Sequence, residues 1–192
     1  MTKISDKRSE IMQAALELIA EQGFHRTPMA EIAEKAGVAA GSIYRYFESK
    51  DILITELYRE LEDKIMVVLQ KGYPSERPLR ERFLYLIREL LRYFMSHPSH
   101  FRYLEQYYNS PYGISLHTDR LLGKTDKHSI LMDIFEQGID QQVIKEFPKA
   151  VLFALAIGPL SFLMRDYILG CVSLDDALIK QIAEACWNAI KK

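Results

Sequence analysis

The 192-residue sequence lacks the features that define several classes of protein. Its two cysteines, Cys171 and Cys186, are too few for a disulfide framework in a chain of this length, which favours a reducing compartment. The N-terminus has no apolar signal core, and no run of 18 or more apolar residues occurs. The longest candidate, residues 150–163, is too short and is followed by Arg165 and Asp166. We therefore expect a cytoplasmic protein without a membrane segment.

An excess of charge of either sign is also missing. The formal net charge is −1, and the contents of 48% hydrophobic and 27% charged residues are ordinary for a soluble globular protein. Cations and anions are balanced in the first fifty residues as well. This disfavours a non-specific coat for nucleic acid, so any DNA binding must depend on where individual cations lie.

Signals for catalysis and metal binding are missing too. The sequence has no Ser-His-Asp order, phosphate-binding loop or dinucleotide fingerprint, so we expect neither enzyme activity nor a cofactor. His97 and His100 lie close together and could be joined by His117 or His128 as metal ligands. No cysteine or paired carboxylate completes a recognisable zinc spacing, and we predict no metal site.

What the sequence does contain is helical periodicity along almost its whole length. Apolar residues recur every three or four positions, and no stretch alternates with the period of a strand. We predict an all-α fold with about nine helices. The expected ranges are 5–22, 28–36, 40–47, 50–69, 76–95, 99–108, 125–141, 147–169 (interrupted at Gly158 and Pro159) and 174–190, with a loop at 109–113 and an ambiguous stretch at 117–123.

Residues 27–51 predict two short helices joined by a tight turn, followed by the start of a third helix. Thr27 before Pro28 is a typical N-cap followed by a first helical residue. Gly37 follows the last periodic residue, where a left-handed C-cap is needed. Ser49 can cap the third helix. A helix, a short turn containing glycine and a second helix together form the helix-turn-helix signature.

These residues resemble the DNA-binding core of tetracycline-repressor-type (TetR-family) transcriptional regulators. The resemblance covers about 45 residues when the preceding helix and Gly23-Phe24 are included, and such an ordered array is far more specific than a lone short motif. The matching elements are Thr27, Ile32-Ala33, Ala36-Gly37-Val38, Gly41-Ser42-Ile43-Tyr44, Tyr46-Phe47, Ser49-Lys50-Asp51 and Leu53. The resemblance implies a DNA-binding domain over residues 1–50 and a helical effector-binding and dimerisation domain over residues 51–192.

A DNA-reading surface needs small residues where the backbone meets base edges and polar groups where phosphates lie. Arginine is the commonest partner for guanine, so Arg45 is a candidate base reader. By resemblance, Thr27, Tyr46 and Lys50 look like phosphate contacts. The predicted DNA-binding set is Thr27, Ala39, Ala40, Gly41, Ser42, Tyr44, Arg45, Tyr46 and Lys50. Capping alone would also explain Thr27, and Ile43 and Phe47 are predicted to be core.

The family resemblance places a homodimer contact on the last two helices, here about 148–169 and 174–190. The first of these is apolar nearly all round, as expected for a helix covered on two sides, although burial within one subunit is the alternative. A DNA site with two-fold symmetry requires two DNA-binding domains, which agrees with a dimer. The predicted interface residues are Leu155, Phe162, Ile179, Ile182 and Trp187.

The middle of the chain is rich in aromatic residues, and the resemblance implies a small effector bound among these helices. An ordinary helical core with tyrosines at its rim is the alternative. We predict a largely apolar or aromatic effector of unknown identity. The predicted pocket residues are Phe83, Ile87, Phe94, Tyr103, Tyr107, His117, Phe135 and Phe153.

The combined interpretation is a ligand-responsive regulator of transcription, most simply a repressor, whose partners are double-stranded DNA, a second copy of itself and the effector. The resemblance implies that effector binding shifts the helix over 50–69, so that two recognition helices no longer match successive major grooves. The alternatives are an activator, a regulator without an effector, or a helical scaffold or enzyme that uses the helix-turn-helix for protein contact.

Overall fold

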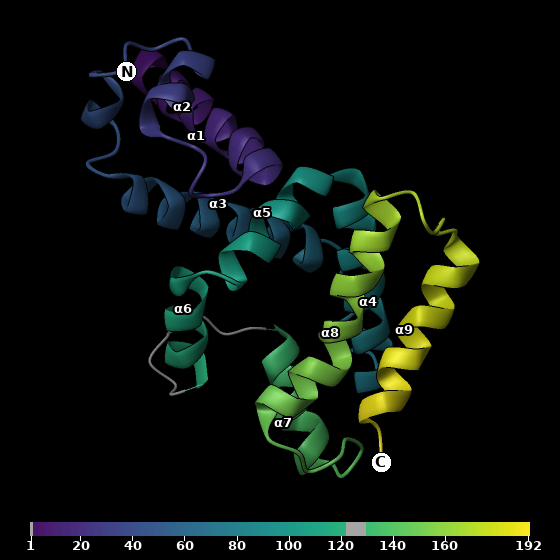
Figure 1. Ribbon diagram of the computed structural model, residues 1–192. Coiled ribbons are helices and arrows are strands. Elements are labelled where there is room, and N and C mark those ends of the chain that lie inside the picture. The colour runs from purple at the N-terminus through teal and green to yellow at the C-terminus, as the bar shows by residue number, and fades with distance from the viewer. Residues whose placement is uncertain (1, 122–129) are drawn as a thin grey trace. The chain divides into compact units, whose positions relative to one another are not determined.

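The computed structural model describes residues 2–121 and 130–192, with side chains described for 7–116 and 130–192. These residues form nine α-helices and one turn of 3-10 helix, and they contain no strand apart from an isolated bridge between Ile144 and Lys191. The all-α prediction is confirmed. The helices are α1 (Thr2–Gln22), α2 (Met29–Lys35), α3 (Lys50–Gln70), α4 (Leu79–Ser96), α5 (Pro98–Tyr108), α6 (Pro111–Leu121), α7 (Ile130–Asp140), α8 (Lys149–Ile168) and α9 (Asp176–Ile190), and the 3-10 turn is Ile43–Arg45 (Figure 1).

The chain divides into two compact units. The first unit comprises Met1–Lys64 and His97–Ser115, and the second comprises Ile65–Ser96 and Leu116–Lys192. The first unit is larger than the predicted head of residues 1–50, because it adds most of α3, all of α5 and the start of α6. The boundary of the DNA-binding domain itself stays a prediction.

In the first unit, α1 packs against both α2 and α5 (Figure 1). The apolar positions of α1, including Ile11 and Ile19, are fully buried, which explains the helical periodicity of this stretch. The buried Tyr103 hydroxyl on α5 donates a hydrogen bond to the Ile54 carbonyl on α3 at 2.6 Å. The Gln106 side chain donates to the Ile19 carbonyl at 2.8 Å. These two bonds join α5 to α3 and to α1 within the first unit.

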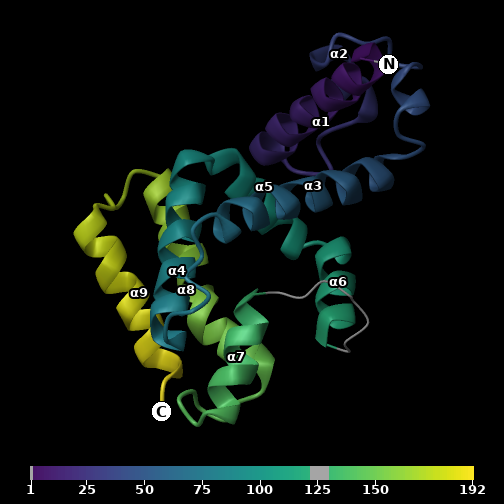
Figure 2. The same cartoon turned by 180° about the vertical axis from the view of Figure 1, so that it is seen from behind.

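In the second unit, α4 packs against α7, α8 and α9, and Figure 1 and Figure 2 show α4, α8 and α9 side by side. The inward face of α4 carries Phe83, Ile87 and Leu91, all fully buried. The Phe83 ring lies 5.5 Å from the Trp187 ring of α9, centroid to centroid. The buried Leu152 is one of the residues that α8 contributes to the core of this unit.

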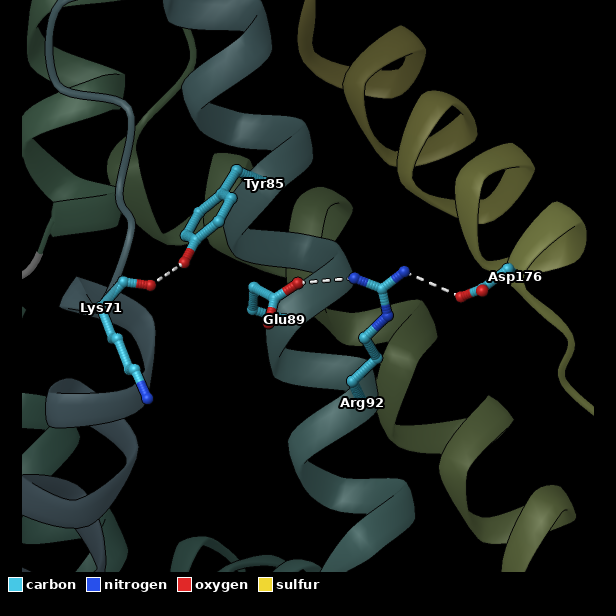
Figure 3. Close-up of polar contacts among 5 residues, drawn as sticks. All are labelled: Lys71, Tyr85, Glu89, Arg92 and Asp176. Carbon is cyan, nitrogen blue, oxygen red and sulfur yellow. Dashed lines mark hydrogen bonds and ion pairs between the residues drawn. The ribbon is translucent and has the colours of Figure 1, made fainter.

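Polar contacts on the surface of the second unit align α4 with α9 (Figure 3). Arg92 on α4 donates to Glu89 at 2.7 Å and to Asp176, the first residue of α9, at 2.8 Å. The hydrogen bond to Asp176, followed by that to Glu89, raises the pKa of the Arg92 guanidinium. The Tyr85 hydroxyl donates to the Lys71 carbonyl, which holds the connection between α3 and α4.

Two predicted interruptions are wrong. The predicted loop at 109–113 contains the start of α6, because Pro111 occupies the first helical position, where its missing N–H costs nothing. α8 runs through Pro159 without a break. Pro159 cannot donate to the carbonyl of Leu155, but it is exposed, so water can bond the carbonyl that it frees.

Candidate nucleic-acid interface

α2 and the turn that follows it have the predicted arrangement. α2 buries Met29, Ile32 and Ala33, so its apolar residues face inward. Gly37 has φ of +64°, the left-handed conformation predicted for this C-cap. The Gly37 N–H donates to the Glu34 carbonyl at 3.0 Å, and the next N–H in the chain also bonds back into α2, so the helix end is satisfied.

Thr27 does not cap α2. Its side chain is fully buried, and its hydroxyl donates to the Gly23 carbonyl at 2.8 Å. Pro28 occupies the N-cap position, without a capping side-chain hydrogen bond. The capping prediction is therefore wrong, because the hydroxyl satisfies the turn after α1 instead. The structure places the predicted phosphate contact of Thr27 beneath the surface of the head.

The stretch predicted as a second helix, residues 40–47, is less regular than expected. We call residues 39–47 the recognition segment. It contains turns and a single 3-10 turn, with i to i+3 hydrogen bonds from Ser42 to Ala39 (2.7 Å), from Arg45 to Ser42 (3.1 Å) and from Tyr46 to Ile43 (3.0 Å). A helix of two turns gains few hydrogen bonds for the backbone entropy that it costs, and short 3-10 turns are a common result.

The recognition segment nevertheless has two distinct sides. Ile43 and Phe47 are buried, at 0% and 1% exposure, as predicted. Tyr44 is 53% exposed, and Ser42 and Tyr46 are half-buried. The remaining outward positions are Ala39, Ala40, Gly41 and Arg45, all exposed. The segment thus presents small and polar groups outward and anchors itself through two apolar side chains.

Lys50, at the start of α3, is half-buried and donates to the Phe24 carbonyl. Desolvation lowers the pKa of its ammonium group, and the neighbouring Asp51 carboxylate acts in the opposite direction. Ser49 accepts a hydrogen bond from the Ile52 N–H at 3.2 Å, which is the predicted cap of α3. The ammonium group of Lys50 is therefore held against the turn that follows α1.

Sequence reasoning missed one residue behind the recognition segment. Arg8 lies within α1, in agreement with the predicted helix over 5–22, but it is not among the residues predicted for the DNA-reading surface. Its guanidinium carbon lies 5.1 Å from the centroid of the Phe47 ring, and its Nη2 pairs with Glu56 on α3. No local pattern indicates these contacts, because the partners are distant in sequence.

The predicted effector-pocket residues are divided between the two units. Tyr103 and Tyr107 are buried in the first unit, and Phe83, Ile87 and Phe135 are buried in the second. Of the others in the second unit, Phe94 is half-buried and Phe153 is 38% exposed, whereas the side chain of His117 lies outside the described residues. The pocket stays a prediction.

A groove of about 550 Å³ lies in the first unit, between α1, the end of α2 and the middle of α3, and none of the predicted pocket residues lines it. The His97 and His100 rings stack at 4.9 Å in the same unit. Among the residues that the structure describes, no three His, Cys, Asp or Glu side chains are grouped so that they could hold a metal ion.

The predicted dimer residues separate into core and surface. Ile179 and Trp187 on α9 are buried within the chain, at 2% and 3% exposure, so they belong to the core of the second unit. Leu155 and Ile182 are half-buried. Phe162 on α8 is 68% exposed. By length and composition α8 is also the one described helix that could cross a membrane, a property that it shares with core helices of soluble proteins.

Comparison with known proteins supports this description of the N-terminal head and of the C-terminal helices. The family model described as bacterial regulatory proteins, tetR family, matches residues 11–57. A model described as the tetracyclin repressor-like C-terminal domain matches residues 78–191, more than half of the chain.

Whole-length relatives agree with the family models. An uncharacterised helix-turn-helix-type transcriptional regulator of Haemophilus influenzae is 25% identical over 98% of this chain and 97% of its own. A putative TetR-family regulator from Vibrio parahaemolyticus is 32% identical, covering 97% of this chain and 99% of its own, with a TM-score of 0.77. A TetR-family regulator from Marinobacter aquaeolei shares the fold, with a TM-score of 0.84 at 22% identity over 98% and 97% of the two chains.

Both family models, the full-length relatives and the exposed polar side of the recognition segment lead to one conclusion. The protein is not an enzyme: the chain belongs to the TetR family of helix-turn-helix regulators of transcription, which bind DNA through the N-terminal head.

Proposed function

We propose that this regulator is a repressor that binds a two-fold operator as a homodimer and is released by a small, largely apolar effector. The observation that carries the proposal is the two-sided recognition segment, which buries Ile43 and Phe47 and exposes small and polar groups. A segment that enters the major groove needs this division, because its inner side must be held rigidly and its outer side must approach base edges closely.

Individual residues then take distinct roles at the DNA. The exposed Arg45 is suited to reading guanine, and the hydroxyls of Tyr44 and Tyr46 are suited to phosphates. A Cβ added at Gly41 would meet no atom of the chain within 4 Å, so the space beside the backbone there is open to a ligand. Lys50 adds a cation at the start of α3.

The outer face of α8 supports the homodimer. Val151, Phe162 and the C-cap residue Leu169 are 41%, 68% and 66% exposed and lie on one side of the helix, together with the small residues Ala154 and Gly158. Arg165 lies on the same side, with its guanidinium carbon 5.2 Å from the Phe162 ring centroid. Apolar surface of this kind needs a partner. We assign it to a second copy of the chain, since a two-fold operator needs two heads, and we place the protein in the cytoplasm with the DNA.

The effector acts through linkage between the two binding sites. It must bind more tightly to the conformation that does not match the operator, and DNA then lowers the affinity for the effector by the same factor. We infer a largely apolar or aromatic effector from the aromatic side chains in the middle of the chain. The resemblance to ligand-responsive regulators supports the same mechanism.

The test is binding of the purified protein to the DNA upstream of its own gene, at several salt concentrations, beside a scrambled duplex of equal length and composition. We expect saturable, sequence-selective binding. The logarithm of the binding constant should fall linearly with the logarithm of the salt concentration, with a slope of about −0.9 per phosphate contact. Operator recognition would be contradicted by weak and equal binding to the two duplexes, provided that duplexes selected from a random-sequence pool also bind no better than the scrambled duplex. Transcription from the bound promoter in vitro then distinguishes a repressor from an activator.

A further inference from the structure

The recognition segment depends on its neighbours for its orientation. Its regular structure is limited to the 3-10 turn Ile43–Arg45, and its N-cap, Ser42, makes no capping side-chain hydrogen bond. It is anchored inward by Ile43 near its middle and Phe47 at its end. A side chain that fixes the position of the Phe47 ring therefore influences the orientation of the exposed side of the recognition segment.

Arg8 of α1 covers that ring. Its guanidinium carbon is 5.1 Å from the ring centroid, within the range of a cation–π contact. Its Nη2 donates to the Glu56 carboxylate on α3, and its Nη1 lies 3.3 Å from the Met12 sulfur. A single side chain thus connects α1, the end of the recognition segment and α3.

Arginine is the residue suited to this position. Its planar guanidinium can lie over a ring and pair with a carboxylate at the same time, which the ammonium group of lysine cannot do with the same geometry. The Arg8 and Glu56 side chains are 42% and 35% exposed, and ion pairs of that exposure stabilise folded proteins little. Arg8 also precedes residues 11–57, the stretch that matches the family model of the head.

We propose that Arg8 is a positioning residue for DNA reading: paired with Glu56, it fixes the Phe47 ring and so orients the recognition segment, without itself binding DNA. This inference rests on the proposed function, since it requires that the recognition segment reads the operator. The competing role for a cation in the head is a phosphate contact, which Glu56 would weaken by competing for the guanidinium.

The two roles predict opposite effects of Glu56→Gln. If Arg8 positions Phe47, loss of the pair loosens the guanidinium and weakens operator binding. If Arg8 binds phosphate, removal of Glu56 frees it and strengthens binding. The matched control is Glu60→Gln, one turn further along α3, where the carboxylate pairs with Lys64 within the same helix at 2.7 Å. It reports the general effect of removing one negative charge from this helix.

The experiment uses the full-length protein and a duplex selected by the wild-type protein from a random-sequence pool, beside a scrambled duplex of the same composition. Affinities are measured over a salt series, well below the thermal midpoint of each variant. For Arg8→Ala we expect selected-duplex binding to fall by about tenfold or more, the equivalent of a misaligned base contact, with scrambled-duplex binding and the salt slope unchanged. Arg8→Lys, which keeps the charge and the fold, should recover only part of the loss.

Three outcomes would overturn the proposal. The first is a salt slope that falls by about 0.9 for each Arg8 removed, which would make Arg8 a phosphate contact. The second is Glu56→Gln binding the selected duplex more tightly than Glu60→Gln does. The third is unchanged affinity in Arg8→Ala with only its thermal midpoint lowered, which would make the role purely structural. A wild-type protein that selects no duplex would overturn the proposed function first, and this inference with it.

Discussion

The recognition segment and the outer face of α8 are both exposed, but they differ in the side chains they present. The recognition segment buries its apolar residues and exposes alanine, glycine, tyrosine and arginine. α8 buries Leu152, Ala156, Leu160 and Met164, whereas Phe162 and the C-cap residue Leu169 are exposed. The contrast matters because the two surfaces, each within its own unit, suit partners of different chemistry.

The physical reason lies in what each partner offers. DNA presents phosphates and polar base edges, so a surface that reads it gains from cations and hydroxyls. A second protein surface offers apolar area, whose removal from water drives association without directional bonds. Four substitutions test this comparison, beginning with the largest expected effect.

Phe162→Asp should break the apolar surface. A carboxylate at the centre of an apolar interface must be desolvated even beside Arg165, whose guanidinium carbon lies 5.2 Å from the Phe162 ring centroid. Central aromatic residues also carry much of the binding energy of such contacts. We expect the dimer to dissociate into monomers, with operator affinity reduced by about 100-fold or more, as measured by analytical ultracentrifugation and DNA titration. The control is Val67→Asp on α3, where the side chain is 66% exposed but lies outside α8. A Phe162→Asp protein that remains dimeric would contradict the assignment.

Arg45→Ala should break the polar surface while the dimer persists. Loss of a bidentate base contact costs about 1–3 kcal/mol, so operator affinity should fall by about 5- to 150-fold per contact. Circular dichroism and ultracentrifugation should be unchanged. Arg77→Ala is the matched control, because Arg77 is a 68% exposed cation outside the head. Equal affinities for the two variants would exclude Arg45 from the interface.

Thr27→Val tests the support beneath the polar surface. The substitution keeps the shape of the buried side chain but leaves the Gly23 carbonyl without its hydroxyl donor. We expect the free energy of unfolding to fall by about 1–3 kcal/mol in urea titrations. Thr27→Ser retains the donor and should lose less. A larger loss for serine than for valine would show that the methyl group, rather than the hydrogen bond, is important.

His100→Asn should have the smallest effect, confined to acid pH. Burial, followed by the charges of His97 and Lys64, lowers the pKa of His100 from 6.5 to about 4. The unfolded chain therefore binds a proton that the folded chain does not between about pH 6.5 and 4, so stability is lost as the pH falls through this window. We expect the variant to show a smaller decrease of the thermal midpoint between pH 7 and 4.5. The exposed His25 is the control, and a His25→Asn variant that flattens the profile equally would contradict this assignment.

Much of the head follows from local sequence patterns. The burial of Ile32, Ile43 and Phe47 and the positive φ of Gly37 depend on residues within a few positions of each other, so periodicity and backbone sterics are sufficient to predict them. The ordered motif of residues 27–51 likewise indicates the family correctly. The effector pocket could not be predicted with the same precision, because aromatic residues at helical spacing are equally typical of an ordinary core.

By itself, the sequence determined the all-α class, the place of the helix-turn-helix and the apolar character of α8. Only the tertiary structure decided that Thr27 bonds inward, that Trp187 belongs to the core against Phe83, and that Arg8 pairs with Glu56. The physical reason is the range of the interactions. Helical periodicity and turn chemistry act between near neighbours, whereas Arg8 and Glu56 are 48 residues apart and meet only when α1, α3 and the recognition segment pack together.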